Sequence, residues 1–434
     1  MGLGLFAWSL VRTFVSTEEH FPMVPLTVLL ASTQWCLMPA IAYWIDFRHF
    51  KMGMSCSEDV YMPIACGGLM AYALGLSIGA PRRRTESVQE AVEALRLFFL
   101  QRPNSVPVLL GISVVSLAAL PFTPGVLQFP VVLLAQTRFA AVLALIVTRR
   151  RLVTPVILVV MAFEAWSSTR TGMFHDLILW SAILGIAYMH SFQIRPPIRI
   201  LILGAGVLLV ASLQIVKGDF REGAWAGSVD QGLEFAMTRG DSAFSSTSTF
   251  LNELEAQLPR FNQGWIISAA ISFTPKYRPF LHGESVQAAV EGALLPRILS
   301  SNKVKAGTTD LIESTTGIAI SEGTSMGLSP VGESYVNFGA VGGAAFMLLL
   351  GLIYSGAFRA LRSLSARRPL LLVFIPGTLQ YVMRAEGELA GGLNHLTKAL
   401  IVYIALTFVL TRVDLGLGTR RRAVATAGPT PPAS

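Results

Sequence analysis

Charged side chains are scarce in this sequence. They occupy 14% of its 434 positions, hydrophobic residues occupy 53%, and the mean hydropathy is +0.57. A soluble domain carries about 25% charged residues, so the composition excludes an ordinary soluble protein. The charges separate apolar runs of about the length that crosses a bilayer, roughly 17–25 residues. The net charge of +8 does not indicate nucleic-acid binding, because Lys and Arg lie mainly at the ends of these runs.

Cysteine and the motifs of metal and nucleotide chemistry are also scarce. Of the three cysteines, Cys36 and Cys66 lie in apolar runs and Cys56 lies in a loop, so no internal disulfide is implied. No H-E-x-x-H motif, P-loop or Cys/His metal spacing is present. We therefore expect no metal site and no cofactor. The sequence also lacks a D-x-D pair, for which the E-G-E segment at 386–388 is a poor substitute, and no internal repeat is evident.

The apolar runs predict an all-α, polytopic membrane protein of about ten transmembrane helices. The expected spans lie near 25–45, 60–80, 105–121, 126–148, 152–167, 172–192, 199–216, 339–358, 369–385 and 396–411. Residues 3–16 are also apolar, but the run is short and interrupted by Arg12. An interfacial helix is the favoured interpretation of that stretch, and an eleventh span is the alternative.

Positive charge is divided very unevenly between the alternate loops of this arrangement. The short loops of one set hold only Arg48, Lys51 and Arg170. The other set holds Arg82, Arg83, Arg84, Arg96, Arg102, Arg149, Arg150, Arg151, Arg195, Arg199, Arg359, Arg362, Arg367, Arg368, Arg412, Arg420, Arg421 and Arg422. The positive-inside rule therefore predicts that both termini are cytoplasmic and that the long loop is external.

Four regions follow from this topology. They are an N-terminal bundle of about seven spans, an external helical loop, a C-terminal bundle of about three spans and a disordered cytoplasmic tail, at 1–216, 217–338, 339–412 and 413–434. The loop is too long for a connector without structure. Its stretches 244–258 and 285–299 have helical periodicity, so we expect a small helical cap lying on the membrane. Residues 86–101 predict an amphipathic helix on the cytoplasmic side.

Ionisable residues gather at the external face of the predicted spans. Two external turns and the long loop contribute them: Glu164, Arg170, His175 and Asp176; Arg384, Glu386, Glu388, His395 and Lys398; and Arg221, Arg239, Arg260, Arg278, Arg297 and Glu333. Each residue alone is explained by a salt bridge or by snorkelling to the membrane surface. Together they predict an electropositive cleft with carboxylates at the outer leaflet. Such a cleft suits a lipid-linked phosphate or pyrophosphate, which arginine can bind through two parallel hydrogen bonds.

Several segments between about 165 and 360 resemble the superfamily of O-antigen polymerases and ligases. The strongest similarity is at 323–342, GTSMGLSPVGESYVNFGAVG, which is similar to the stretch that leads from the external loop into the next span. Residues 166–172 (WSSTRTG) resemble the S-x-R-G turn of that superfamily. Further loop segments resemble Wzy-type oligosaccharide repeat-unit polymerases: LPRFNQG at 259–265, RPFLHGE at 278–284, and LLPRI at 294–298 followed by Lys303 and Lys305.

The resemblance implies metal-independent glycosyl transfer at the outer face of a bacterial inner membrane. The donor would be a glycan on undecaprenyl pyrophosphate, and the acceptor a sugar hydroxyl on a second lipid-linked repeat unit, so that O-antigen or exopolysaccharide grows. A chain-length regulator is a further partner that the resemblance implies. Cations must stabilise the leaving pyrophosphate. The candidates are Arg170, which ranks first, and Arg260, Arg278 and Arg297.

The same reaction needs a base that removes the acceptor proton. Glu333 is the candidate, because it lies in the best-matching segment about six residues before a span. A helix-end charge favoured by the helix dipole is the simpler interpretation. The ligase branch carries a His in this segment, and residues 323–342 contain none. This difference favours a polymerase over a ligase and leaves the base open, with His282 and His395 as alternatives.

Three other functions stay open at this point. An O-antigen-ligase-like enzyme would perform the same chemistry on a different acceptor. A transporter or flippase of lipid-linked sugars would need no base, and its charges would face a central cavity from both halves of the chain. A glycosyltransferase of dolichol-type architecture would place its acidic residue in the first external loop, where Glu58 and Asp59 stand. The sugar, its linkage and the stereochemical outcome do not follow from the sequence.

Overall fold

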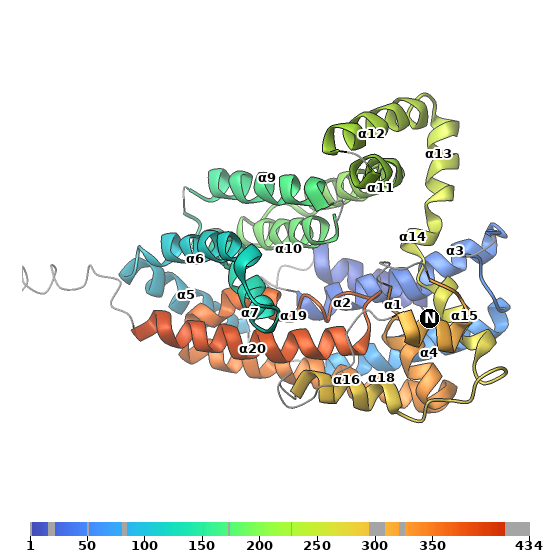
Figure 1. Cartoon of the computed structure of the whole chain (residues 1–434). Helices are drawn as coiled ribbons and strands as arrows, with labels where there is room; N and C mark the ends of the chain where they lie inside the picture. The colour runs from blue at the N-terminus through green and yellow to red at the C-terminus, as the bar shows by residue number, and fades with distance from the viewer. Residues whose placement is uncertain are drawn as a thin grey trace, which may run out of the picture.

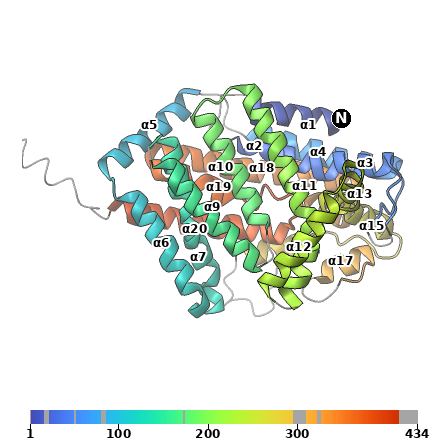
Figure 2. The same ribbon diagram turned by 90° about the horizontal axis from the view of Figure 1, so that it is seen from above.

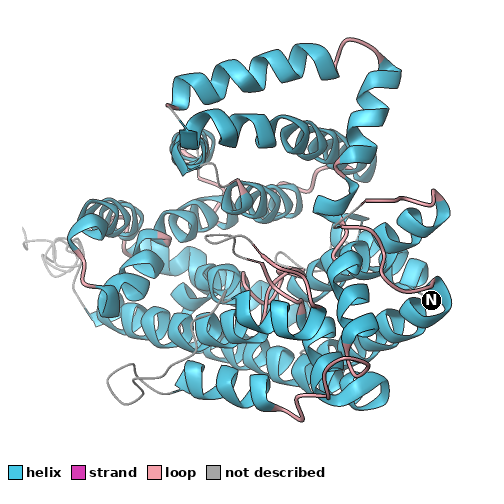
Figure 3. Ribbon diagram, turned by 45° about the vertical axis from the view of Figure 1, so that its right-hand side comes forward, coloured by secondary structure: helices cyan, strands magenta, loops and turns pink. Residues whose placement is uncertain are grey.

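The computed structural model describes residues 2–15, 22–49, 52–79, 85–150, 152–171, 174–226, 228–294, 309–320 and 326–412. Within these ranges every regular element is a helix and no strand occurs (Figure 3). Most of the long helices run side by side along one direction (Figure 1). The all-α class expected from the sequence is therefore confirmed. The tail predicted at 413–434 lies outside the described residues.

Helices follow one another along the whole described chain. Up to residue 226 they are α1 (Gly2–Leu10), the π-helix η1 (Val11–Val15), α2 (Met23–Ser32), the π-helix η2 (Thr33–Leu37), α3 (Met38–Trp44), α4 (Glu58–Gly79), α5 (Thr85–Gln101), α6 (Ser105–Ala119), the 3-10 helix η3 (Leu120–Phe122), α7 (Gly125–Ala135), α8 (Thr137–Val147), α9 (Val153–Thr171), α10 (His175–Ser191) and α11 (Pro196–Ala226). The later elements are α12 (Val229–Ala243), α13 (Thr247–Ala256), α14 (Leu258–Phe261), α15 (Gly264–Phe273), α16 (Glu284–Leu294), α17 (Thr309–Thr316), α18 (Pro330–Arg367), the 3-10 helix η4 (Pro369–Phe374), α19 (Ile375–Leu379) and α20 (Leu389–Arg412).

Among the described residues, seven helices are long and apolar enough to cross a membrane, and each coincides with a predicted span. They are Met23–Trp44, Glu58–Ile78, Ser105–Phe122, Gly125–Val147, Pro196–Phe220, Pro330–Arg367 and Leu389–Arg412. The predicted number of about ten differs, because three expected spans fall short of these criteria. Two of them are α9, which contains Glu164 and Arg170, and α10, which has only 17 residues. Both still run alongside the longer helices (Figures 1 and 2).

The third missing span, expected at 369–385, is not a continuous helix. It consists of η4 and α19, each with a proline at its start, followed by a turn that leads to α20. Residues 370–379 are all buried. The interrupted backbone takes a partner from another helix, since Nε2 of His395 lies 2.8 Å from the carbonyl oxygen of Gly377. Irregular backbone at membrane depth is tolerated when it is buried in protein in this way.

The interfacial helix predicted at 3–16 corresponds to α1 and η1, whose residues Leu3, Trp8 and Val11 are exposed. α1 and η1 pack along α2, and Gly2 lies against Cys36 and Cys66 near the middle of two apolar helices. At the other end of the stretch, the carbonyl oxygen of Phe14 accepts a hydrogen bond from Arg199 at 3.3 Å. The stretch is therefore packed among the helices of the bundle.

The predicted external loop is only partly a cap. α12 folds back along α11, and α13 runs from its end toward α14 (Figure 1). α15 instead enters the bundle, because residues 264–271 are buried and Ser268 accepts a hydrogen bond from the main chain of Ser55 at 2.9 Å. α16 lies along α20. The helices predicted at 86–101, 244–258 and 285–299 correspond to α5, α13 and α16, although 295–299 lie outside the described residues.

The largest helix-to-helix contact joins α4 and α18. Gly75 and Gly351 lie at their crossing, where a Cβ atom on Gly351 would be 2.5 Å from the carbonyl oxygen of Tyr72. Small residues allow two backbones to approach this closely. α18 itself is kinked at Gly339, whose φ of +70° favours glycine. The kink turns the first residues of α18, which carry Glu333, toward the segment that precedes α16.

Arginines at one end of the bundle bind the C-termini of helices. Arg102 donates to a carbonyl in the last turn of α20 at 3.0 Å, Arg150 to one of α5 at 2.7 Å, and Arg359 to one of α4 at 3.1 Å. The last carbonyls of a helix lack partners within it, and positive charge is favourable there. All three arginines belong to the set that the sequence assigned to the cytoplasmic side. We refer to this side of the bundle as the arginine end.

Candidate functional site

A group of charged side chains lies where α10 and α20 begin. Arg384 donates from Nη2 to Asp176 at 2.5 Å, and Nδ1 of His175 lies 3.2 Å from Oε1 of Glu386. His175 and Asp176 open α10, whereas Arg384 and Glu386 lie in the turn before α20. α20 has 24 residues. At about 1.5 Å per residue, the group lies roughly 36 Å from the arginine end.

Side chains of η2 hold this turn in place. Nε2 of Gln34 donates to Oε2 of Glu386 at 3.2 Å, and Nε1 of Trp35 donates to the carbonyl oxygen of Ala385 at 3.0 Å. Gly327 lies directly against the turn, because a Cβ atom there would be 2.4 Å from the carbonyl oxygen of Glu386. The turn therefore has little freedom to move. We use the name charged cluster for Gln34, His175, Asp176, Arg384 and Glu386.

Lys217 brings a further cation to the charged cluster from α11. It lies close enough to His175 to interact with it electrostatically, as do Arg384 and Asp176. The rings of Phe174 and Phe220 pack with centroids 5.8 Å apart, which joins the start of α10 to the same part of α11. Sequence reasoning overlooked Lys217. The signal that could have found it is its position as the first charge after an apolar span.

Aromatic rings connect Arg384 to the interior of the bundle. Its guanidinium lies 4.0 Å from the ring centre of Tyr381, and that ring stacks on His395 with centroids 4.3 Å apart. His395 is only 2% exposed, and its Nε2 faces the carbonyl oxygen of Gly377. A carbonyl oxygen only accepts, so Nε2 carries the proton and cannot take another. In this arrangement His395 supports the broken segment.

Glu333, the candidate base, joins three segments of the chain. Its Oε1 accepts from the hydroxyl of Ser285 at 2.8 Å, and its Oε2 accepts from the main-chain N–H of Leu389 at 2.9 Å. Asn337 also donates to the Ser285 hydroxyl oxygen, at 2.8 Å. Ser285, Glu333 and Leu389 lie in the first turns of α16, α18 and α20, Asn337 lies one turn after Glu333, and Glu333 is 2% exposed. We call Glu333, Ser285, Asn337 and the Leu389 amide the Glu333 junction.

Two predicted site residues lie on the segment beside the Glu333 junction. The main-chain N–H of His282 donates to the carbonyl oxygen of Asn337 at 3.1 Å, with a backbone φ of +48°. The imidazole of His282 is exposed, and so is the guanidinium of Arg278 in the preceding turn. Both side chains are therefore accessible to a ligand.

The other predicted arginines have different surroundings. Arg170, at the end of α9, is exposed, and its guanidinium lies 5.1 Å from the ring centre of Trp166. Arg260 donates to a carbonyl oxygen of α11 at 2.8 Å and so attaches α14 to α11. Arg297 lies outside the described residues. The structure thus places Arg170 in the last turn of α9 and gives Arg260 an anchoring contact.

Glu164 does not take part in the charged cluster. It pairs with Arg138, Oε2 to Nη2 at 2.6 Å, and the two side chains are only 8% and 12% exposed. Arg138 also lies over the ring of Phe139, 4.4 Å from its centre. This buried pair joins α8 to α9 and neutralises both charges within the bundle.

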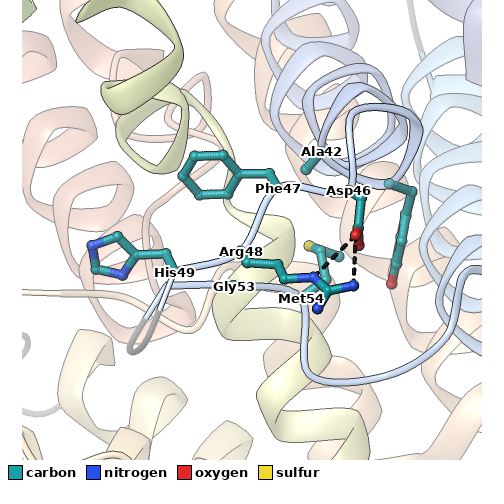
Figure 4. A pocket seen from close by; sticks show the side chains of 8 residues that line it. Ala42, Asp46, Phe47, Arg48, His49, Gly53 and Met54 are labelled. Carbon is teal, nitrogen blue, oxygen red and sulfur yellow. Dashed lines mark hydrogen bonds and ion pairs between the residues drawn. The ribbon is translucent and has the colours of Figure 1, made fainter. Parts of the chain in front are cut away.

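A separate cavity of about 490 Å³ lies in the loop after α3 (Figure 4). Its charged groups are already satisfied, because Arg48 pairs with Asp46 at 2.6 Å and Nδ1 of His49 accepts a main-chain N–H at 3.0 Å. Glu58 and Asp59, which the dolichol-type alternative requires, are exposed in the first turn of α4 and do not line it. The cavity is lined by Ala42, Tyr43, Asp46, Phe47, Arg48, His49, Gly53 and Met54.

The segment 323–327 reads Gly-Thr-Ser-Met-Gly and so contains the G-x-S-x-G pattern of serine hydrolases. That pattern acts at a sharp turn between a strand and a helix. The described ranges contain no strand, and Ser325 lies outside them.

Comparison with protein-family models, with curated proteins and with solved structures finds no match to this chain. Within the described part of the chain, no group of three or more His, Cys, Asp or Glu side chains is placed to hold a metal ion. The function is therefore inferred from the charged cluster and from the resemblance between about 165 and 360.

Proposed function

We propose that this protein is a membrane-embedded glycosyltransferase that polymerises oligosaccharide repeat units carried on undecaprenyl pyrophosphate. One observation carries the proposal. Arg384 lies with Lys217 and the partly exposed pair of His175 and Glu386 at the end of the bundle opposite the arginine end. Arg170 is exposed in the last turn of α9, five residues before His175 in the sequence. Cations, a carboxylate and an imidazole are thus gathered in one place.

Pyrophosphate chemistry explains why cations would gather here. When a sugar leaves a lipid pyrophosphate, negative charge develops on the phosphate oxygens, and fixed donors lower the barrier most where that charge appears. Arg384 has five N–H donors. One of them binds Asp176, and Nε is buried without a hydrogen-bond partner among the described residues. Because Nε is buried, a phosphate oxygen would bind the remaining N–H donors on the two Nη atoms.

The membrane orientation follows from the distribution of arginine. If the arginine end faces the cytoplasm, as the positive-inside rule requires, the charged cluster faces the periplasm of a bacterial inner membrane. The headgroup of a membrane lipid lies at the ends of the spans, which is the depth of the charged cluster. The lipid-linked donor could then reach Arg384 without leaving the bilayer.

Substitution of Arg384 tests the proposal. The assay uses the purified protein in liposomes with undecaprenyl-pyrophosphate-linked oligosaccharides, and chain products are measured by gel electrophoresis. Arg384→Ala should slow polymerisation about 100- to 1000-fold, the cost of one fixed donor at a developing anion. Arg384→Lys should retain part of the rate, because the charge stays and the planar fork is lost. Arg48→Ala is the matched control, since it also removes an arginine paired with an aspartate.

Two results would contradict the proposal. Wild-type protein that forms no chains from lipid-linked units would remove the polymerase function. Normal rates in Arg384→Ala would show that the charged cluster is not the pyrophosphate site.

Transport of lipid-linked sugars is a second candidate, and the broken segment at 369–385 favours it. Many transporters bind substrate at interrupted helices, but they contain such interruptions in corresponding positions of both halves. Among the described elements, this interruption lies between α18 and α20, in the C-terminal bundle that the sequence predicts. No internal repeat is evident in the sequence. Movement of a labelled undecaprenyl-pyrophosphate oligosaccharide across liposomes, without chain growth, would establish transport instead.

A further inference from the structure

The pair formed by His175 and Glu386 has the geometry of a base and the carboxylate that orients it. Nδ1 of His175 lies 3.2 Å from Oε1 of Glu386, and the side chains are 44% and 29% exposed. The other carboxylate oxygen accepts from Gln34 at 3.2 Å, so the carboxylate is held from two sides. By contrast, Glu333 and His395 are buried and bound to protein groups. Because Nδ1 of His175 faces Glu386, the second ring nitrogen, Nε2, points away from that carboxylate.

We infer that His175 is the general base of the proposed glycosyl transfer and that Glu386 positions its ring. This inference rests on the proposed function. With the Glu386 carboxylate beside Nδ1, the imidazole favours the tautomer that has its proton on Nδ1 and a lone pair on Nε2. The hydroxyl oxygen of the acceptor sugar bonds to the anomeric carbon while its proton passes to Nε2. The bond from that carbon to the pyrophosphate oxygen breaks, and its electron pair leaves with the lipid pyrophosphate.

The charges that face His175 suit this sequence of events. They come from three elements. Lys217 lies on α11, Asp176 follows His175 on α10, and Arg384 and Glu386 lie on the turn before α20. Before the donor binds, Lys217 and Arg384 disfavour an imidazolium at His175, whereas Glu386 and Asp176 favour it. A bound pyrophosphate neutralises those cations, so the imidazolium that forms during transfer becomes less unfavourable.

The test compares four variants in the polymerisation assay. His175→Ala and His175→Gln should lower turnover about 100- to 10,000-fold, the range of general base catalysis. They should bind undecaprenyl pyrophosphate, measured separately, nearly as well as the wild type. Glu386→Gln should also lower turnover, and Glu386→Asp should restore part of it. His49→Ala is the control, because it removes an imidazole from the loop after α3.

The pH profile separates a base from a structural residue. Wild-type turnover should rise with pH as the imidazole loses its proton, and the remaining activity of His175→Gln should lack that rise. The rise in Glu386→Gln should occur at a lower pH, because the imidazolium has lost its carboxylate.

Each other outcome has a definite meaning. If the wild type forms chains and His175→Gln forms them equally well, the inference is wrong and the proposed function stands. If His282→Ala alone is inactive, His282 is the base. If the wild type forms no chains, the proposed function and the inference fail together.

Discussion

Replacement of Glu333 separates a structural role from a catalytic one. In Glu333→Ala the main-chain N–H of Leu389 and the hydroxyl of Ser285 both lose their acceptor in a buried region. Each unsatisfied buried group costs about 1–3 kcal/mol. The two together therefore lower the free energy of unfolding by roughly 2–6 kcal/mol, before any cavity is counted.

Glu333→Gln is a milder change of the same contacts. The amide has one acceptor oxygen, which can take the N–H of Leu389, while its NH₂ group faces the hydroxyl oxygen of Ser285. That oxygen already accepts from Asn337, and it has room for two hydrogen bonds. Only the hydroxyl proton of Ser285 is left without an acceptor. We expect a loss of about 0.5–1.5 kcal/mol, the usual contribution of one hydrogen bond.

Thermal unfolding in detergent, followed together with the polymerisation rate, decides between the roles. The expected order of stability is wild type, Glu333→Gln and then Glu333→Ala. Glu291→Gln is the control, because Glu291 is an exposed carboxylate on α16 that binds only Gln287 among the contacts of the described chain. Wild-type stability of Glu333→Ala would refute the Glu333 junction. A Glu333→Gln protein of normal stability that is about 100- to 10,000-fold slower would instead identify Glu333 as the base.

Two further predictions test the packing of the bundle. The sulfur atoms of Cys36 and Cys66 are 3.4 Å apart, so copper phenanthroline should link them and protect both from a maleimide mass tag. Cys36→Ser should abolish the protection and Cys56→Ser should not. Unprotected thiols in the wild type would contradict the packing of η2 on α4. Gly351→Ala should lower the free energy of unfolding by about 1–3 kcal/mol through overpacking, since its Cβ would lie 2.5 Å from a backbone oxygen of α4. Gly356→Ala is the control, because a Cβ atom on Gly356 would meet no other atom within 4 Å. Equal melting temperatures of the two variants would refute the close crossing of α4 and α18.

The sequence predicted structure well where one physical constraint decides it. In hydrocarbon every backbone polar group must be satisfied within its own segment, so a long apolar run forms a helix. Seven predicted spans agree with helices for this reason. Hydropathy does not show whether a neighbour such as His395 will satisfy an interrupted backbone, and the segment at 369–385 was therefore predicted wrongly. The Pro-Gly pair at 376–377 was the local signal of a break. Residues 264–273 were too short for a span, yet tertiary contacts bury most of them.

The candidate site was predictable in position and unpredictable in detail. Topology placed the segments that carry His175 and Arg384 at the same end of the bundle. In the structure His175 lies within ion-pairing distance of Glu386, and Arg384 lies within ion-pairing distance of Asp176. Which residue binds which depends on the rotation of each helix about its axis, and hydropathy does not determine that rotation. Gln34 was overlooked because it lies inside an apolar run. A single glutamine next to tryptophan within a span is nonetheless costly in lipid, and that cost is the signal of a polar partner.

The turn before α20 owes its conformation to side chains from other helices. Gln34 and Trp35 reach it from η2, Asp176 from α10, and Glu333 binds the first residue of the helix that follows it. A donor stabilises a developing charge strongly only if it is fixed before the reaction starts. Contacts from three separate helical segments fix this turn, and Arg384 itself is held by Asp176 and by the ring of Tyr381. If Arg384 binds the leaving group of the proposed reaction, it therefore does so from a position that is set before the substrate arrives.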